Sequence, residues 1–113
     1  MGRSGSTAAR PVSWMKRKSI RIQSQAQEEI NEAFDWYFKR NPEAASAFLT
    51  EIGASFAQIA SHPQLYSIYT KNTRRCVLAK FPYSVIYKEK DDVILIVAIA
   101  HAKRRPGYWR GRI

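Results

Sequence analysis

The chain has 113 residues, a formal net charge of +10 and a single cysteine, Cys76. This length suits one domain with a modest core, and a lone cysteine excludes an internal disulfide framework. No apolar run is long enough to span a membrane and no secretory signal pattern is visible, so we expect a cytoplasmic protein.

The excess positive charge lies at the two ends of the sequence. Residues 1–18 carry five cations and no acid, and residues 101–113 carry five more cations and no acid. Residues 19–100 hold nine cations and nine anions, so the body of the chain is neutral. Basic ends on a neutral body indicate an acidic partner, either nucleic acid or an acidic protein segment; the alternative is that they serve only solubility.

The first residues lack any structural pattern. Residues 1–13 are small, polar and without periodicity, which is typical of disorder. Met15 offers an alternative start of translation. We therefore expect residues 1–14 to form a disordered extension and residues 15–113 to form the folded domain.

A short strand and a helix are predicted next. Residues 19–23 alternate polar and apolar side chains, as a half-buried strand does. Ser24 is then expected to cap a helix over residues 25–40, with Gln27 completing a capping box.

A second helix follows after a tight link. Asn41 is a suitable N-cap and Pro42 suits the first helical position, so the apolar stripe that follows predicts a helix to about Ser61. Gly53 interrupts this helix, and we expect it to allow a close approach to the first helix. The short link makes the two helices an antiparallel hairpin.

Three further runs predict strands. They cover residues 73–81, 83–90 and 93–100, and they follow a loop that extends through Asn72. Short reversals between the runs favour antiparallel neighbours, and the last run, apolar on both faces, should be the most central strand. The expected fold is α+β: an N-terminal strand and an antiparallel two-helix hairpin packed on a mainly antiparallel sheet of about four strands.

The stretch after the last strand carries the strongest candidates for chemistry. His101 is a candidate general base, because histidine titrates near neutral pH; the alternative is a histidine hydrogen-bonded at a strand end. Arg104 and Arg105 can hold a phosphate or a carboxylate in a bidentate contact. Tyr108 and Trp109 can stack on a base or anchor a protein partner, and Trp109 also suits a latch over the sheet edge.

A second cationic element opens the strand at residue 73. Successive strand residues point to opposite faces, so either Arg74 or Arg75 should face the helix-free side, near the cations after His101. Two isolated histidines and one cysteine provide no metal site, and no cofactor is expected. The residues expected to bind a partner are Arg75, Arg104, Arg105, Tyr108, Trp109, Arg110 and Arg112.

Three motifs in this part of the chain are found together in one known group of proteins. They are Arg75, the segment Phe81-Pro82-Tyr83 with Tyr87, and the pattern His101-x-x-Arg104-x-Pro106-x-Tyr108-Trp109 followed by Arg112. The chain thereby resembles the RelE/ParE superfamily of type II toxins, often labelled plasmid stabilisation proteins, over residues 19–112. The resemblance implies a helix hairpin on a small antiparallel sheet, in agreement with the fold expected above.

The resemblance implies two modes of action. RelE-like members cleave mRNA in the ribosome without a metal, using basic residues on the sheet and near the C-terminus. ParE-like members inhibit DNA gyrase by binding to it. Both kinds are neutralised by a cognate antitoxin, so a toxin–antitoxin hetero-oligomer is expected.

Two departures from the RelE-like pattern favour the ParE-like mode. RelE-like nucleases commonly place an arginine where this chain has Ser84, and they present two lysines where Arg75 and Val77 stand here. Metal-free cleavage depends on preorganised cations that neutralise the phosphorane. We therefore expect a non-nucleolytic toxin that inhibits gyrase.

Two alternatives stay open. A ribosome-dependent mRNA endonuclease would use Arg75, His101, Arg105 and Tyr108, with His101 or Tyr108 transferring the proton. A degenerate member would still fold and bind an antitoxin but would no longer be toxic.

Overall fold

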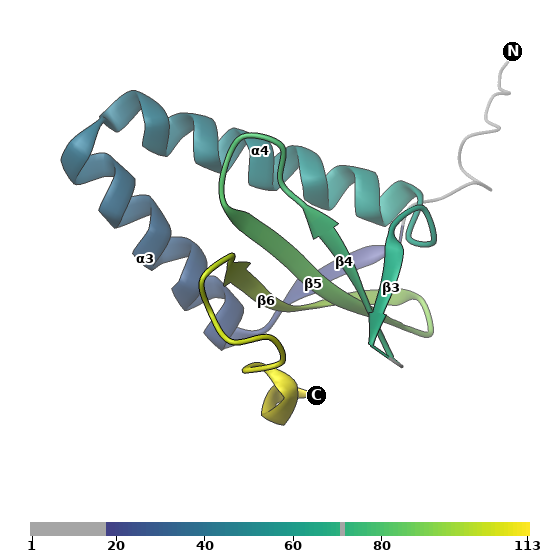
Figure 1. The fold of residues 1–113 in the computed structure, drawn as a ribbon. Helices are drawn as coiled ribbons and strands as arrows, with labels where there is room; N and C mark the ends of the chain where they lie inside the picture. The colour runs from purple at the N-terminus through teal and green to yellow at the C-terminus, as the bar shows by residue number, and fades with distance from the viewer. Residues whose placement is uncertain (1–17, 71) are drawn as a thin grey trace, which may run out of the picture.

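The computed structural model describes residues 18–70 and 72–113, and it has the α+β architecture that the sequence predicts (Figure 1). In chain order the elements are β2 (Ser19–Ile22), α3 (Ser24–Arg40), α4 (Pro42–Ser61), β3 (Ser67–Thr70), β4 (Thr73–Val77), β5 (Tyr83–Lys90), β6 (Val93–His101) and the short 3₁₀ helix η1 (Arg110–Arg112). The extension expected at residues 1–14 lies outside the described residues.

The sheet has five strands in the order β2-β6-β5-β4-β3, rather than about four. Strand β2 runs parallel to β6, and the other neighbours are antiparallel. The additional strand is β3, which the sequence placed in a loop. Its first two residues are exposed and it pairs on one side only, so it lacks the alternation that predicts a strand. The middle strand is β5, and the prediction that β6 is the most central was wrong.

The two helices begin and end close to where the sequence predicts. Ser24 is the first residue of α3 rather than its cap, and the Gln27 N–H donates to the Gln23 carbonyl, so the expected capping box is absent. In α4 the prediction is confirmed, because the Asn41 side chain accepts a hydrogen bond from the Glu43 N–H at 3.0 Å. Within residues 18–70 and 72–113, no helix is both long and apolar enough to cross a membrane.

The expected reason for Gly53 was wrong. A Cβ atom built at this position meets no atom within 4 Å, so the glycine does not serve a close approach between the helices. It lies instead on an exposed part of α4.

Strand β4 ends at Val77, four residues earlier than predicted. The chain then forms a loop over residues 78–82, closed by a hydrogen bond from the Leu78 N–H to the Tyr83 carbonyl at 3.0 Å. The carboxylate of Glu51 on α4 accepts hydrogen bonds from the backbone N–H groups of the next two residues, Ala79 and Lys80. The helix therefore supplies the acceptors that a longer strand pairing would have supplied.

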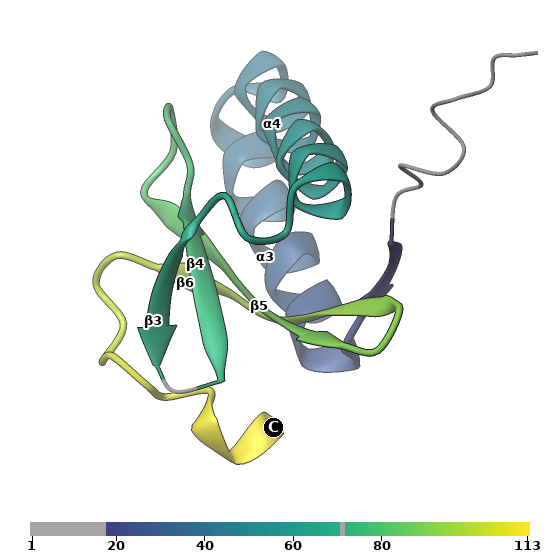
Figure 2. The same cartoon turned by 90° about the vertical axis from the view of Figure 1, so that its right-hand side faces the viewer.

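Both faces of the sheet are covered. On one face the helices bury an apolar cluster that includes Phe48, Ile59 and Ile96. On the other face the C-terminal segment buries Trp109 with Ile86, next to Val97. Figure 2 shows the helices on one side of the sheet and the C-terminal segment, in yellow, on the other. This second layer explains why β6 is apolar on both faces.

Candidate partner-binding site

The C-terminal segment is held to the helix-free face of the sheet by Trp109. This side chain is 1% exposed and packs with the cluster around Ile86 and Val97. Its ring centroid lies 6.0 Å from that of Tyr69 in β3. Trp109 therefore holds the segment against the face of the sheet, over the inner strands β5 and β6, whereas the sequence suggested a latch over the sheet edge.

A carboxylate on α3 fixes the same segment from the other side. Glu29, whose side chain is 12% exposed, accepts hydrogen bonds from the Tyr108 hydroxyl at 2.6 Å and from both Nη atoms of Arg112 at 3.0 Å. It also accepts from the Ile99 N–H at 2.9 Å, while Gln23 Nε2 donates to the Arg112 carbonyl at 2.8 Å. The Glu29 carboxylate thus joins α3 to the second half of β6 and to the C-terminal segment.

This network also sets the protonation of its members. Burial raises the pKa of the Tyr108 phenol above its ordinary value, and the hydrogen bond to the Glu29 carboxylate raises the pKa further. The hydrogen bond to Glu29 raises the pKa of the Arg112 guanidinium, against the opposing effect of burial. At neutral pH, Tyr108 is therefore a neutral donor and Arg112 a cation, both engaged by Glu29.

The exposed cations gather around a small hollow beside this network. The hollow has a volume of about 120 Å³ and lies on the helix-free face, between β3, the ends of β5 and β6, and the C-terminal segment. Arg75 contributes its guanidinium from β4 and stacks over the Tyr69 ring, with Cζ 4.4 Å from the centroid. Arg104 stacks over the Tyr108 ring at 3.8 Å. The candidate residues that line the hollow are Arg75, Ser84, His101, Arg104, Arg105, Tyr108 and Trp109.

His101 is held in place by its neighbours. Its Nδ1 atom accepts a hydrogen bond from the Lys103 N–H at 3.0 Å, and its ring makes an edge contact with Tyr83 at 4.9 Å between centroids. Because Nδ1 is an acceptor, Nε2 carries the proton of the neutral ring. In the described part of the chain no acid hydrogen-bonds to His101, and no three acids, histidines or cysteines cluster as metal ligands would.

The structure divides the predicted site residues into two groups. Arg75, Arg104, Arg105 and Arg110 are exposed and free to meet a partner. The remaining three are largely turned inward: Trp109 in the second core, and Tyr108 and Arg112 on Glu29. Sequence reasoning missed Glu29, because an acid in the first turns of a helix is explained by the helix dipole alone.

The helix hairpin on a small, mainly antiparallel sheet is the fold that the resemblance to the RelE/ParE superfamily implies. The family described as "ParE toxin of type II toxin-antitoxin system, parDE" matches residues 20–106. The chain belongs to this family.

Two known proteins illustrate the relationship. The chain is 35% identical over 89 residues to "Putative toxin Y4kP" of Sinorhizobium fredii (strain NBRC 101917 / NGR234), a match that covers 77% of this chain and 93% of that protein. It is also similar to a solved chain described as "Chromosomal ParDE TA system from P. aeruginosa", with a TM-score of 0.68 and 18% identity over 77% of this chain and 98% of the other. The second likeness is one of fold.

Proposed function

We propose that this chain is a ParE-like toxin that acts in the cytoplasm by binding and inhibiting DNA gyrase, and that a cognate antitoxin neutralises it. The observation that carries the choice against nuclease chemistry is the hydrogen bond from the Tyr108 hydroxyl to Glu29 at 2.6 Å. A phenol with a raised pKa, committed to a carboxylate, is poorly suited to transfer a proton in an RNA cleavage step. Ser84, in the same hollow, adds no charge where a nuclease would place an arginine.

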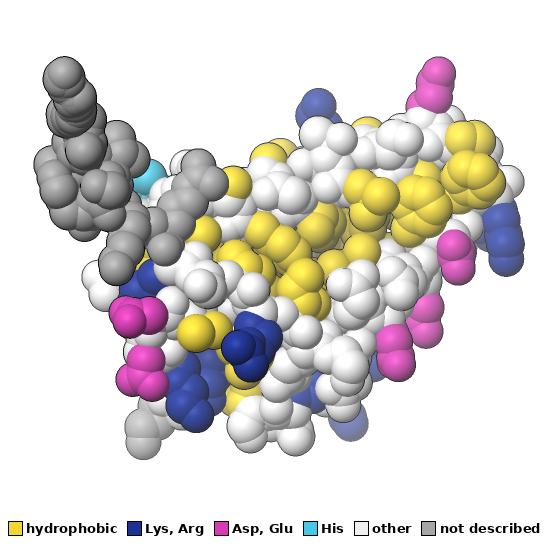
Figure 3. Space-filling model, turned by 180° about the vertical axis from the view of Figure 1, so that it is seen from behind, with side chains coloured by type: hydrophobic (Ala, Val, Ile, Leu, Met, Phe, Trp, Pro, Cys, Tyr) yellow, Lys and Arg dark blue, Asp and Glu magenta, His cyan; other side chains and the backbone are white. Residues whose placement is uncertain are grey.

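Control by an antitoxin is supported by the surface of the helix hairpin. Phe38 on α3 and Leu49 on α4 are 52% and 43% exposed, and Phe38 stacks on Phe34 at 5.7 Å between centroids. Figure 3 shows a band of apolar side chains along the hairpin, on the face seen from behind. An apolar band of this kind suits an amphipathic segment of a partner.

The experiment that tests this function is pulse labelling of DNA and protein synthesis within minutes of inducing the chain without an antitoxin. We expect DNA synthesis to stop first, and we expect the purified protein to inhibit supercoiling by gyrase. If protein synthesis stops first and gyrase is unaffected, the proposal is wrong. If both syntheses continue and the cells grow, the chain is a degenerate member.

The nuclease alternative has one observation in its favour, because Arg75, His101, Arg105 and Tyr108 line a single hollow. Under that alternative, Arg75→Ala and Arg105→Ala each lower the rate of mRNA cleavage by about 10²–10³-fold, the loss expected for one well-placed donor. Arg21→Ala is the matched control, since Arg21 is an exposed arginine on β2 that does not line the hollow. Under the proposed function, no cleavage of mRNA accompanies expression of any of these chains.

A further inference from the structure

A second and larger concavity lies on the other side of the loop that follows β6. It has a volume of about 490 Å³ and separates α3 from the ends of β5 and β6. Its walls are aromatic: Trp36 meets Tyr37 edge to face at 5.1 Å, and Tyr83 meets His101 edge to face at 4.9 Å. We refer to this concavity as the α3 groove. Its size and lining are those of a site that holds a large apolar side chain.

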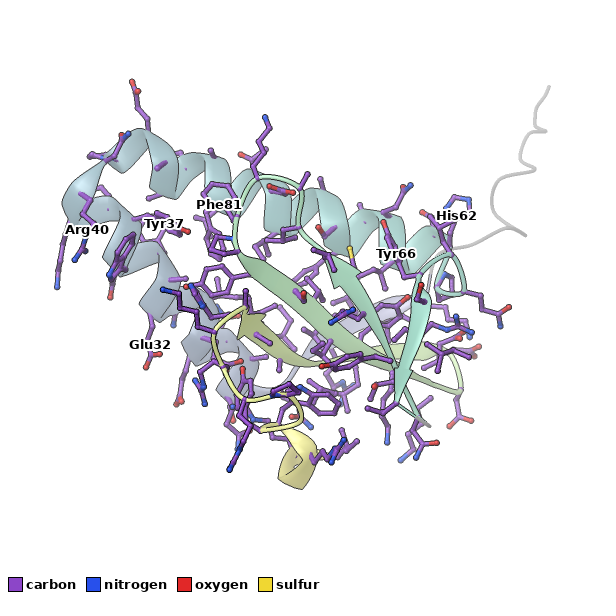
Figure 4. All side chains as sticks on the ribbon, in the orientation of Figure 1. Glu32, Tyr37, Arg40, His62, Tyr66 and Phe81 are labelled. Atoms are coloured by element: carbon purple, nitrogen blue, oxygen red, sulfur yellow. The ribbon has the colours of Figure 1, made fainter. Side chains whose placement is uncertain are left out.

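The charges around the α3 groove are not balanced. Two acids and two cations line it, but the acid Glu29 is already paired with Arg112. Lys103 and Arg104 are exposed on the rim, and neither forms an ion pair with any residue in the described part of the chain. The rim therefore offers two unpaired cations against one remaining acid, Glu32. Figure 4 shows Glu32 on the outer side of α3, with Tyr37 pointing instead toward Phe81.

We infer that the α3 groove is a docking site for an acidic protein segment, which inserts one large apolar side chain among the aromatic walls and sets its carboxylates against Lys103 and Arg104. A protein segment fits better than nucleic acid, because the lining of the groove is largely aromatic and apolar and carries two unpaired cations, fewer than a nucleic-acid strand with several phosphates would need. Identifying the segment as part of the antitoxin rests on the function proposed above. The groove itself does not depend on that identification.

The position of the α3 groove gives such a segment a route to the basic hollow. His101 and Arg104 line both the groove and the hollow, from opposite sides of the same loop. A carboxylate bound to Arg104 competes with the Tyr108 ring, which the guanidinium covers at 3.8 Å. A segment docked in the groove thus moves Arg104 away from the Tyr108 ring and changes the surface of the basic hollow without covering it.

The inference is tested by titrating the full chain with acetyl-Glu-Trp-Glu-amide and following the backbone and indole NMR signals. The paired variants are Trp36→Ala and Leu65→Ala, because both apolar side chains are exposed, at 52% and 60%, and only Trp36 lines the groove. Lys103→Glu is compared with Lys90→Glu, which changes an exposed lysine at the end of β5 that lines neither the groove nor the hollow. We expect Trp36→Ala and Lys103→Glu each to weaken peptide binding by about tenfold, and the two controls to leave it unchanged.

Three outcomes of the titration would overturn the inference. The first is equal binding by Trp36→Ala and Leu65→Ala. The second is equal affinity for acetyl-Gln-Trp-Gln-amide, which would show that the cations play no part. The third is a single-stranded oligonucleotide that shifts the same signals more strongly than the acidic peptide.

A parallel measurement with the cognate antitoxin separates this inference from the proposed function. If the antitoxin binds the wild type and Trp36→Ala equally, the assignment of the groove is wrong while neutralisation by an antitoxin stands. If no antitoxin binds but the peptide still depends on Trp36 and Lys103, neutralisation by an antitoxin is wrong and the groove stands.

Discussion

Glu29 holds the C-terminal segment to helix α3 and to strand β6. Its carboxylate accepts hydrogen bonds from Tyr108, Arg112 and the Ile99 backbone. The side chains of Glu29 and Arg112 are 12% and 15% exposed, so salt and water weaken their pairing much less than they weaken an exposed pair. Loss of either partner leaves the other buried without its counterpart.

We therefore expect Glu29→Gln to lower the free energy of unfolding by about 1–3 kcal/mol, because an amide satisfies the Arg112 and Tyr108 donors incompletely. Urea unfolding followed by circular dichroism measures the change. Glu32→Gln is the control, since Glu32 is an exposed acid on the same helix and should change stability by less than about 0.5 kcal/mol. Equal midpoints for the two variants would contradict the structural role of Glu29.

A second residue-level prediction concerns pH. The pKa of Tyr87 is raised from 10.0 to about 12, chiefly by burial. The Tyr87 hydroxyl donates a hydrogen bond to the Pro63 carbonyl at 2.6 Å. Between these pH values the unfolded chain has released this proton and the folded chain still holds it. The free energy of unfolding therefore falls as pH rises above 10, by at most about 1.4 kcal/mol per pH unit from this group.

The variant Tyr87→Phe removes this contribution. We expect its stability to fall less steeply than that of the wild type in urea titrations between about pH 9 and 11. At neutral pH it should be less stable by about 1 kcal/mol, because the Pro63 carbonyl loses its donor. Parallel slopes for the two proteins would show that Tyr87 keeps an ordinary pKa.

At the scale of elements, the sequence predicts a helix or strand well when the residues that determine it lie close to it in the sequence. The bounds of helices α3 and α4 are predicted almost to the residue. The signals for them, an apolar stripe and a cap such as Asn41, lie within the helical segments or next to them. Strand β3 and the end of β4 are not found, because β3 depends on its pairing with β4 and the loop at residues 78–82 depends on Glu51, which lies on α4. Neither the β3–β4 pairing nor the Glu51 contact can be recognised from the residues of the strand or loop that depends on it.

The loop after β4 gives the prediction at this scale. Glu51→Ala should accelerate hydrogen exchange at the Ala79 and Lys80 amides and lower stability by about 1 kcal/mol, because both N–H groups lose their acceptor. Gln58→Ala is the control, an exposed change on the same helix. If these amides exchange at the wild-type rate in Glu51→Ala, the carboxylate does not hold the loop.

At the scale of the whole molecule, the candidate site was predicted in part. The sequence identified the cations and aromatic residues of the C-terminal segment, because basic residues and aromatics crowd a short stretch there. It could not distinguish residues that face outward, such as Arg105, from residues that hold the segment down, such as Trp109 and Arg112. That distinction depends on a second core, which forms only when residues far apart in the sequence meet across the sheet.

The second core can be tested directly. Trp109→Ala should cost about 3–5 kcal/mol of stability, since it removes a side chain that is 1% exposed and leaves a cavity over the sheet. Arg110→Ala, at the next position and exposed, should change stability by less than about 0.5 kcal/mol. Denaturant unfolding of both variants measures the difference. A small effect of Trp109→Ala would mean that the segment is not anchored there.

The hydrogen bond from Tyr108 to Glu29 joins residues separated by 79 positions in the sequence. The hydrogen bond from Gln23 to Arg112 joins residues separated by 89 positions. Among the described residues, strand β2 likewise pairs with β6, more than 70 positions later in the sequence. On a translating ribosome the hydrogen bonds of Tyr108 and Arg112 cannot form until residues 108–112 have left the exit tunnel. Until then, the rest of the nascent chain lacks these contacts. Such non-local pairing also slows folding in general. The native basic surface, and any harm it does to the cell that makes it, therefore arises only after this part of the chain is complete, which leaves an interval in which a newly made partner can meet the chain first.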